Sequence, residues 1–343
     1  MNRTSIIFEK QYTLGLKSET LSEPAAKEVL IKTRFSAISA GTELLVYRGE
    51  FPPGLPVDAN IKALSKPFGY PLKYGYTSVG EVVAVGAAVK KDWLGRQAFC
   101  FHPHESHYTA SLKQIIPIPE DIEPLEAIFL PNMETAVNFI MDGQPVIGER
   151  AVIFGQGIVG LLTAALLAQF PLANLITVDP YAMRRRASLD VGVHHTLDPT
   201  EATFLSDLTA LLNTDSATGL ADLIYELSGN PQALNQAVAI AGFSARVIVG
   251  SWYGTKQANL DLGGRFHRNR IRLISSQVSS LSPGFAGRWT KKRRLETAWD
   301  MIRRIRPAPL ITHRYPIRQA NKAFELLDKN PEEAMQVIIT YDP

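Results

Sequence analysis

The stretch Glu149–Phe170 reads ERAVIFGQGIVGLLTAALLAQF, and it decides the fold that we expect. Its first part, Glu149–Phe154, has the short apolar character of a buried strand, whereas Gly157–Phe170 is an apolar run long enough for a helix. The turn between them has the form GxGxxG. A glycine turn that joins a strand to a helix is typical of a domain that binds a dinucleotide, because phosphates can approach the free N–H groups of the helix.

The residues of this turn are the first candidates for cofactor binding. They are Gly155, Gln156, Gly157, Ile158, Val159 and Gly160. The first glycine permits a tight turn, the second allows close approach of a pyrophosphate, and the third allows the helix to pack on the strand.

An acidic residue, Asp179, ends the next expected strand, Leu175–Val178, at the distance typical of this motif. Its carboxylate would accept hydrogen bonds from the ribose hydroxyls and repel a 2′-phosphate, which favours NAD(H) over NADP(H). Arg184, together with Arg185 and Arg186, follows closely and could bind such a phosphate instead. Both cofactors therefore stay open, with NAD(H) favoured.

Further expected strands alternate with helical segments, which indicates an α/β fold with a parallel, doubly wound sheet. These strands are Asp222–Leu227, Ala245–Val249 and Ile271–Ser275. The first third of the chain instead has short β-branched runs interrupted by Pro and Gly, which predicts an antiparallel, partly barrel-like unit. Its clearest segments are the strands Val29–Arg34, Ser78–Val85 and Ile115–Ile118 and the loop Lys62–Tyr70.

The end of the chain predicts helices at Lys291–Arg304 and Ile317–Lys329 and a closing strand at Gln336–Tyr341. We expect a β-rich domain built from both ends of the chain around a nucleotide-binding domain. The predicted boundaries are 1–130 for the first part, 131–276 for the nucleotide-binding domain and 277–343 for the return.

Composition limits the class of protein. Of the 343 residues, 45% are hydrophobic and 20% are charged, which is ordinary for a soluble globular chain. A net charge of +3 is too mild to indicate nucleic acid as a partner. Cys100 is the only cysteine, so an intrachain disulfide and a cysteine-rich zinc site are both excluded. The sequence has no signal-peptide pattern and no apolar run that could span a bilayer, so we expect a cytoplasmic protein with no membrane partner.

Three motifs resemble those of a known family. Ser39–Glu43 (SAGTE) resembles I-C-G-T-D, Gly75–Val82 (GYTSVGEV) resembles G-H-E-x-x-G-x-V, and Ser228–Asn230 matches an S/T-G-N turn. Over essentially its full length the chain resembles the medium-chain dehydrogenase/reductase superfamily. This resemblance implies a GroES-like catalytic domain plus a Rossmann domain, and an NAD(P)-dependent oxidoreductase that interconverts a secondary alcohol and a ketone. It also implies a homodimer joined through the strand near Ile271–Ser275.

A closer resemblance is to the zinc-free branch that contains bacteriochlorophyllide a dehydrogenase. The segments that carry it are Ala37–Glu43, Gly69–Leu72 with Gly75-Tyr76, and Ile311–Arg314. Where the zinc alcohol dehydrogenases have their Cys and His ligands, this chain has Ala40 and Tyr76, and Pro131 aligns with the third ligand. Neither Ala40 nor Tyr76 binds zinc in the usual way, so the sequence predicts catalysis without zinc.

Without zinc, a protein group must handle the proton of the alcohol. Tyr76, in place of the His ligand, and Thr42, which matches the family's proton-relaying Ser/Thr, are the first candidates, with His104 and Glu43 as further ones. Other candidates for these acid and base roles are His107 and Glu134. An alternative interpretation is a metal site formed by His102, His104, Glu105 and His107, although a polar turn explains them as well.

The resemblance also implies further cofactor contacts, with Thr135 beside the nicotinamide. The others are Ser228, Gly229, Gly250, Ser251 and Trp252. The basic stretch Arg288–Arg306 indicates a solvated helix face or, alternatively, attraction of an anionic substrate. Two other functions stay open: an NADPH-dependent quinone or enone reductase, and a catalytically inactive nucleotide-binding protein.

Overall fold

The computed structural model describes residues 1–52, 54–57, 64, 67–212 and 220–341. The chain divides into two units, Met1–Pro131 with Arg306–Pro343, and Asn132–Ile305. The second unit thus continues beyond the boundary at 276 that the sequence suggested, because the side chain of Arg294 is buried among residues of that unit. Part of the expected loop Lys62–Tyr70 lies outside the described residues.

The second unit is built on a six-stranded parallel sheet with the order β10-β9-β8-β11-β12-β13. Its strands are β8 (Arg150–Phe154), β9 (Asn174–Val178), β10 (His195–Leu197), β11 (Ala221–Glu226), β12 (Ala241–Val249) and β13 (Arg272–Ser275). The order reverses between β8 and β11, which makes this point of the sheet the expected place for a ligand. The doubly wound parallel sheet that the sequence predicted is therefore confirmed.

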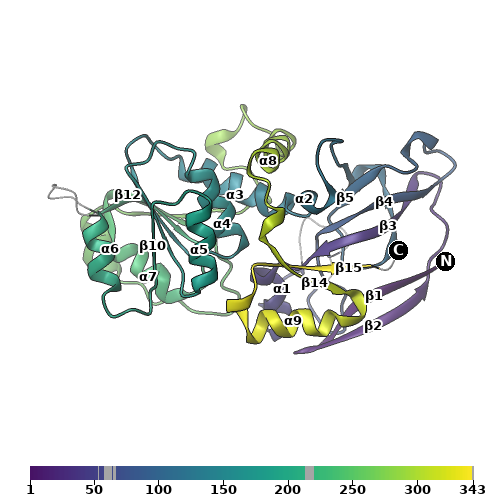
Figure 1. Cartoon of the computed structure of the whole chain (residues 1–343), viewed down its shortest axis with the longest axis horizontal. Coiled ribbons are helices and arrows are strands. Elements are labelled where there is room, and N and C mark those ends of the chain that lie inside the picture. Colours follow the sequence, from purple (N-terminus) through teal and green to yellow (C-terminus); the bar gives the residue numbers. More distant parts are fainter. Residues whose placement is uncertain (53, 58–63, 65–66, 213–219, 342–343) are drawn as a thin grey trace. The chain divides into compact units, whose positions relative to one another are not determined.

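Helices cover both faces of this sheet (Figure 1). They are α3 (Leu130–Gly143), α4 (Ile158–Leu167), α5 (Ala182–Asp190), α6 (Phe204–Leu212) and α7 (Pro231–Ala239). Helix α8 (Lys291–Ile305) also belongs to this unit. Apolar residues of α6 and α7 pack on one face, and those of α3 and α4 pack on the other. The sheet is covered on both sides, so its central strands are apolar throughout, as in parallel sheets generally.

The first unit contains an antiparallel hairpin and a seven-stranded sheet with the order β14-β15-β3-β4-β5-β7, to which β6 adds by pairing with β3. Its strands are β1 (Asn2–Lys10), β2 (Thr13–Thr20), β3 (Glu28–Ala37), β4 (Ser78–Val85), β5 (Gln97–Cys100), β6 (His107–Ser111), β7 (Ile115–Pro117), β14 (Ile311–Pro316) and β15 (Gln336–Thr340). Its helices are α1 (Ala40–Arg48), α2 (Pro124–Ala127) and α9 (Ala320–Lys329). Helix α9 packs on the hairpin and on α1 through a shared apolar core that includes Phe8, Tyr47 and Phe324.

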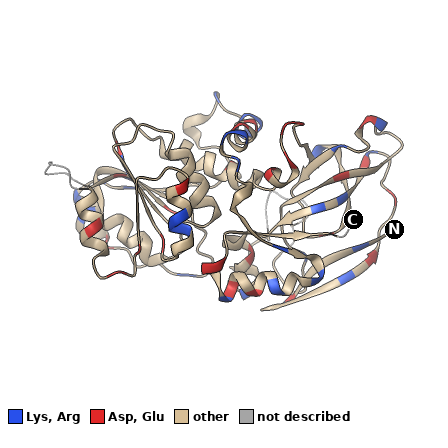
Figure 2. Cartoon of the chain, in the orientation of Figure 1, with Lys and Arg blue, Asp and Glu red and all other residues tan. Residues whose placement is uncertain are grey.

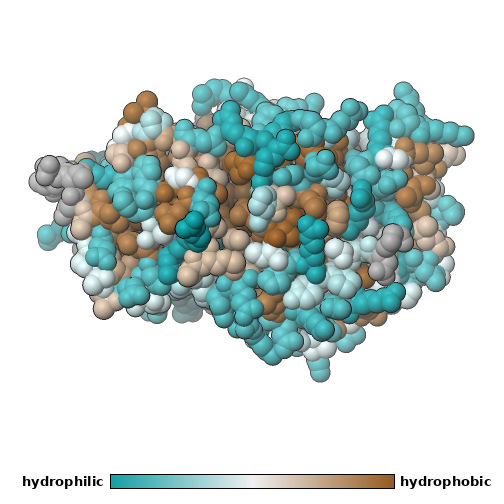
Figure 3. Space-filling model, in the orientation of Figure 1, coloured by the Kyte–Doolittle hydropathy of each residue, from teal (hydrophilic) through white to brown (hydrophobic). Residues whose placement is uncertain are grey.

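Helix α8 carries much of the basic stretch Arg288–Arg306. Blue and red segments of its ribbon mark its basic and acidic residues in Figure 2, and Figure 3 shows hydrophilic atoms at the top of the view, where α8 lies. Lys291, Lys292 and Arg293 are exposed, as a solvated helix face requires, but Arg294 is 1% exposed. Among the described residues, no helix combines the length and apolarity needed to cross a membrane.

Candidate functional site

The glycine turn between β8 and α4 is closely packed at its first and third glycines and open at its second. A Cβ atom at Gly155, where φ is +90°, would lie 2.6 Å from the backbone of Ser228, and one at Gly160 would clash with the carbonyl oxygen of Gly155. A Cβ atom at Gly157 would meet no atom within 4 Å. The first and third glycines therefore permit close packing, and the second leaves the turn open beside the start of α4. Since no side chain caps that helix end, its N–H groups suit an anion.

Asp179 lies at the carboxyl end of β9, beside the glycine turn. One of its carboxylate oxygens accepts a hydrogen bond from the Gln156 N–H at 2.7 Å, and the other accepts from the Tyr181 N–H at 2.9 Å. Burial raises the pKa of Asp179, although the charge of Arg184 and these two hydrogen bonds oppose that effect. Because each carboxylate oxygen can accept more than one hydrogen bond, Asp179 keeps acceptor capacity for ribose hydroxyls.

The three arginines after Asp179 have separate surroundings. Arg185 forms an ion pair with Asp198 at 2.7 Å, and Arg186 forms one with Asp190 at 3.3 Å. The guanidinium of Arg184 lies over the ring of Tyr181, 4.7 Å from its centroid. Arg184 is also the arginine whose charge most affects Asp179, so it is the strongest candidate for contact with a nucleotide phosphate.

The remaining predicted cofactor residues lie at several places in the second unit. Ile158 and Val159 are half-buried in the first turn of α4, while the side chain of Gln156 is buried and bonded to Ser188. Thr135 is half-buried on α3. None of these positions decides whether the predicted contacts form, so they stay predictions.

Glu226 lies at the end of β11 and connects the segments that follow β11 and β12. It was not among the predicted site residues. Its fully buried carboxylate accepts hydrogen bonds from the N–H and hydroxyl of Ser228 and from the hydroxyl of Tyr253. Ser251 extends this connection, since its Oγ accepts from the Gly229 N–H at 2.8 Å. The turn after β11 and the segment after β12, which includes the 40% exposed Trp252, are therefore held together. The signal in the sequence was an acid, Glu226, after the apolar residues Leu223–Tyr225 of the run DLIYEL.

In the first unit, two of the predicted proton-handling residues lie near the start of α1. The phenol of Tyr76 donates a hydrogen bond to the Oγ of Ser39, which is the residue that precedes α1. Tyr76 and Thr42 are half-buried. Ser39 was quoted in the sequence only as part of a motif, and its contact with Tyr76 joins segments far apart in the chain.

His104 and Glu43 form a pair in the interior of the same unit. Both side chains are fully buried, and His104 Nε2 lies 2.8 Å from Glu43 Oε2. The other ring nitrogen, Nδ1, lies 2.7 Å from the Oγ of Ser36, which in turn lies 2.8 Å from the hydroxyl of Tyr341. His104 is thus bonded through both ring nitrogens inside the core. The proton-handling role that the sequence suggested for His104 and Glu43 stays a prediction.

The other histidines of that turn point to different partners. His102 stacks on Tyr108 with ring centroids 3.6 Å apart and lies 2.8 Å from Glu105, and His107 Nδ1 lies 3.2 Å from Ser106 Oγ. Within the part of the chain that the structure describes, no three His, Cys, Asp or Glu side chains are grouped so that they could hold a metal ion. The structure thus does not bring His102, His104, Glu105 and His107 together as such a group.

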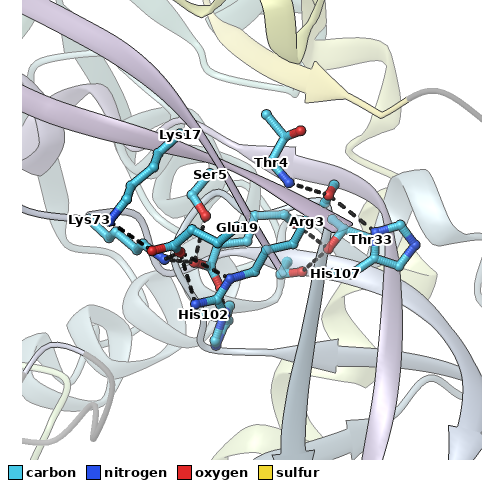
Figure 4. A network of polar contacts seen from close by, with 12 residues as sticks. Arg3, Thr4, Ser5, Lys17, Glu19, Thr33, Lys73, His102 and His107 are labelled. Atoms are coloured by element: carbon cyan, nitrogen blue, oxygen red, sulfur yellow. Dashed lines mark hydrogen bonds and ion pairs between the residues drawn. The ribbon is translucent and has the colours of Figure 1, made fainter. Parts of the chain in front are cut away.

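A buried charge network holds the β1–β2 hairpin to the turn that contains Glu105 (Figure 4). The carboxylate of Glu105 accepts from Lys73 at 2.6 Å, from Arg3 at 3.3 Å and from the hydroxyl of Ser5 at 2.9 Å, in addition to its contact with His102. Burial alone would raise the pKa of Glu105, but hydrogen bonds and charges from His102 and Lys73 outweigh it and lower the pKa to about 2. Burial also lowers the pKa of His102, so its imidazole is neutral near pH 7.

This network predicts a pH-dependent loss of stability. Because the folded pKa of Glu105 lies below the ordinary value of 4.5, its stabilisation is complete above pH 4.5 and is lost as the pH falls toward 2. We expect Glu105→Gln to destabilise the protein by about 3 kcal/mol at neutral pH, and by much less near the folded pKa. Urea unfolding at a series of pH values measures the difference. The exposed Glu120→Gln serves as the control, and a difference that does not shrink with pH would contradict the prediction.

Glu134, a further candidate for acid or base chemistry, is occupied by an ion pair. Arg294 donates to its Oε1 from Nε at 3.1 Å and from Nη2 at 3.0 Å. The same guanidinium donates to Asn138 Oδ1 and to the carbonyl oxygens of Val278 and Ser280. Glu134 and Arg294 therefore fix the segment after β13 against α3, and this accounts for the longer second unit.

Comparison with known proteins finds dehydrogenases among the relatives of this chain. No protein-family model matches the chain. It is 27% identical over 219 residues to L-threonine 3-dehydrogenase of Bacillus subtilis, which covers 61% of this chain and 56% of that protein. It is 22% identical to D-guloside 3-dehydrogenase of Escherichia coli over 92% of this chain and 93% of the relative.

Among solved structures, an alcohol dehydrogenase of Escherichia coli in complex with NADH superimposes with a TM-score of 0.79 and 18% identity over 99% of both chains. The 2R,3R-butanediol dehydrogenase of Bacillus subtilis also reaches 0.79, with 14% identity over 99% of this chain and 100% of that one. The fold is thus shared with these alcohol dehydrogenases and combines a GroES-like unit with a Rossmann unit. The narrower resemblance to the zinc-free branch stays a prediction.

Proposed function

We propose that the protein is an NAD(P)-dependent oxidoreductase of the medium-chain type that interconverts a secondary alcohol and a ketone without zinc. The observation that carries this proposal is the glycine turn, which is open at Gly157 and flanked by the carboxylate of Asp179. Residues of the turn would hold the pyrophosphate, and Asp179 would hold the ribose, which favours NAD(H). When bound, the dinucleotide supplies or accepts a hydride at its nicotinamide ring.

Catalysis without zinc rests on the chemistry of the side chains. Zinc in proteins is bound by thiolate, imidazole or carboxylate, and Ala40 and Tyr76 provide none of these. The residues present therefore do not fit a zinc ion at the positions where the related dehydrogenases bind it. The proton must instead come from a protein hydroxyl, for which we propose Tyr76 first and Thr42 second.

The proposed substrate is a small alcohol or ketone, in keeping with relatives named for threonine and a guloside. The exposed Lys291, Lys292 and Arg293 at the start of α8 favour an anionic one. The proposed partner is a second copy of the chain, because β13 is an edge strand of the parallel sheet in the described part of the chain.

A fluorescence titration tests the proposal directly. The chain has four tryptophans, one of which is the partly exposed Trp252 at the edge of the parallel sheet. NADH and NADPH are added in parallel, and energy transfer from tryptophan to the reduced nicotinamide is followed. Saturable binding, tighter for NADH, is the expected result. A folded protein that binds neither nucleotide would overturn the proposal.

Asp179→Ala tests the cofactor preference. Loss of hydrogen bonds between ribose hydroxyls and a charged acceptor is expected to weaken NADH binding by about 10- to 100-fold, while NADPH binding is spared or improved. Asp190→Ala, which removes an exposed carboxylate from α5, is the matched control. The same titration measures all three proteins. An unchanged ratio of the two affinities in Asp179→Ala would rule out Asp179 as the ribose ligand.

A further inference from the structure

Ser39 and Tyr76 come from two segments of the first unit that are joined by a backbone hydrogen bond from the Ala37 N–H to the Thr77 carbonyl oxygen and by a hydrogen bond between the hydroxyl groups of Ser39 and Tyr76. A phenol that donates to a neighbouring hydroxyl has a defined direction, and this matters for proton transfer, where heavy atoms must be correctly placed. Ser39 immediately precedes α1, and Tyr76 follows Gly75 shortly before β4. What holds these two segments together therefore decides how Tyr76 is oriented.

The buried pair of Glu43 and His104 contacts both segments. On one side, Glu43 Oε1 accepts a hydrogen bond from the Ser39 N–H at 2.9 Å. On the other side, the ring of His104 lies against Gly75, where a Cβ atom would come within 2.6 Å of the ring. Glu43 Oε2 and His104 Nε2 are 2.8 Å apart. One fully buried pair thus lies directly behind both members of the hydroxyl pair.

The orientation of the His104 ring is fixed on its far side as well. Its Nδ1 lies 2.7 Å from Ser36 Oγ, and Ser36 is bonded in turn to Tyr341. Both ring nitrogens and both carboxylate oxygens of the pair therefore have protein partners. Burying a carboxylate and an imidazole is costly, and buried polar pairs of this kind are retained where they specify one arrangement.

We propose that Glu43 and His104 are positioning residues that hold Ser39 and Tyr76 in the geometry needed for proton transfer, a task for which this chain uses no metal ion. The inference rests on the proposed function. In ketone reduction the dinucleotide would supply the hydride for the carbonyl carbon. The Tyr76 hydroxyl turns from Ser39 Oγ to the substrate, its O–H bond breaks, and its proton goes to the substrate oxygen. The phenolate that remains accepts a hydrogen bond from the Ser39 hydroxyl until solvent returns a proton. Alcohol oxidation is the reverse.

The chain offers a matched control for this pair. His102 lies on the same turn as His104, and its Nε2 is also 2.8 Å from a buried glutamate, Glu105. Glu105 is bonded to the β1–β2 hairpin, whereas Glu43 is bonded to Ser39. Replacing His102 therefore breaks a similar pair but leaves the hydroxyl pair in place.

The test uses the full chain with its tyrosines labelled with ¹³C at Cζ, and Tyr76→Phe identifies the Tyr76 resonance. His104→Leu is expected to shift this resonance and to lower kcat by about 10²-fold with an unchanged KM for the nucleotide. His104→Gln, whose amide can still donate to Glu43, is expected to have a resonance position and a kcat between those of the wild type and those of His104→Leu. His102→Leu is expected to leave the resonance and kcat unchanged.

Ser36→Ala keeps the test decisive if His104→Leu does not fold, because it releases only the far side of the ring. A smaller shift of the Tyr76 resonance in the same direction supports the inference, and no shift overturns it. NADH titration of the same samples separates the two proposals. If NADH binds and the Tyr76 resonance is unchanged in both His104→Leu and Ser36→Ala, the positioning role is wrong and the proposed function is unaffected. If NADH does not bind and the resonance shifts, the proposed function fails, and with it the role in proton transfer, while the structural link between His104 and Tyr76 stands.

Discussion

Tyr76→Phe is expected to lower the turnover of the best alcohol or ketone substrate by about 10²- to 10⁴-fold, the range typical of removing a general acid or base. The replacement removes the hydroxyl that donates to Ser39 and keeps the aromatic ring, which packs against the core of the first unit. The proposed nucleotide contacts are the glycine turn and Asp179, which the replacement leaves unchanged, so NADH affinity is expected to stay within about twofold of the wild type. A panel of L-threonine, 2,3-butanediol and a D-guloside, assayed through NADH absorbance, supplies the substrate.

Tyr74→Phe is the control, because it removes a phenol two positions away whose ring is buried against Phe8. It is expected to retain turnover. If Tyr76→Phe is as active as Tyr74→Phe, the proton comes from another group, and Thr42→Val becomes the next variant to measure. A parallel loss of NADH binding and turnover in Tyr76→Phe would instead indicate a folding defect.

The second unit could be predicted from sequence because its signals are local. The strand, turn and helix of Glu149–Phe170 lie in one continuous stretch, and the structure has β8, the turn and α4 there, although α4 ends at Leu167. The helix expected at Lys291–Arg304 is α8, which ends one residue later at Ile305. Hydrophobic periodicity and glycine placement depend on neighbours within a few residues, so they predict these elements without knowledge of distant contacts.

The surroundings of single polar residues could not be predicted in the same way. A histidine between Pro103 and Glu105 resembles part of a surface turn, but His104 is buried because Gly75 leaves room for its ring and Glu43 supplies an acceptor. Both partners are distant in sequence. Likewise, nothing local to Glu226 shows that a hydroxyl from the segment after β12 bonds to it.

Arg294 is the clearest case, because it lies within a run of basic residues that otherwise follows the expected solvated pattern. Its neighbour Arg293 is exposed, with its guanidinium 4.1 Å from the centroid of the Trp289 ring. Arg294 is buried because it faces α3, where Glu134 and Asn138 provide acceptors, and because backbone carbonyls after β13 complete its hydrogen bonds. Because every N–H of this buried guanidinium donates a hydrogen bond, replacing Arg294 would leave several buried acceptors without a partner.

Arg294→Leu is therefore expected to destabilise the second unit by about 3–5 kcal/mol, the cost of removing one partner from a buried ion pair. Burial already raises the pKa of Glu134, and Arg294 opposes that effect, so the variant is expected to raise this pKa further. Guanidinium unfolding gives the stability, and amide exchange of the segment after β13 reports its release. Arg293→Leu, at an exposed site on the same helix, is expected to change stability by about 0.5 kcal/mol or less. Equal effects of the two replacements would mean that the Glu134 ion pair contributes nothing specific, and that α8 is held to the second unit by its apolar face alone.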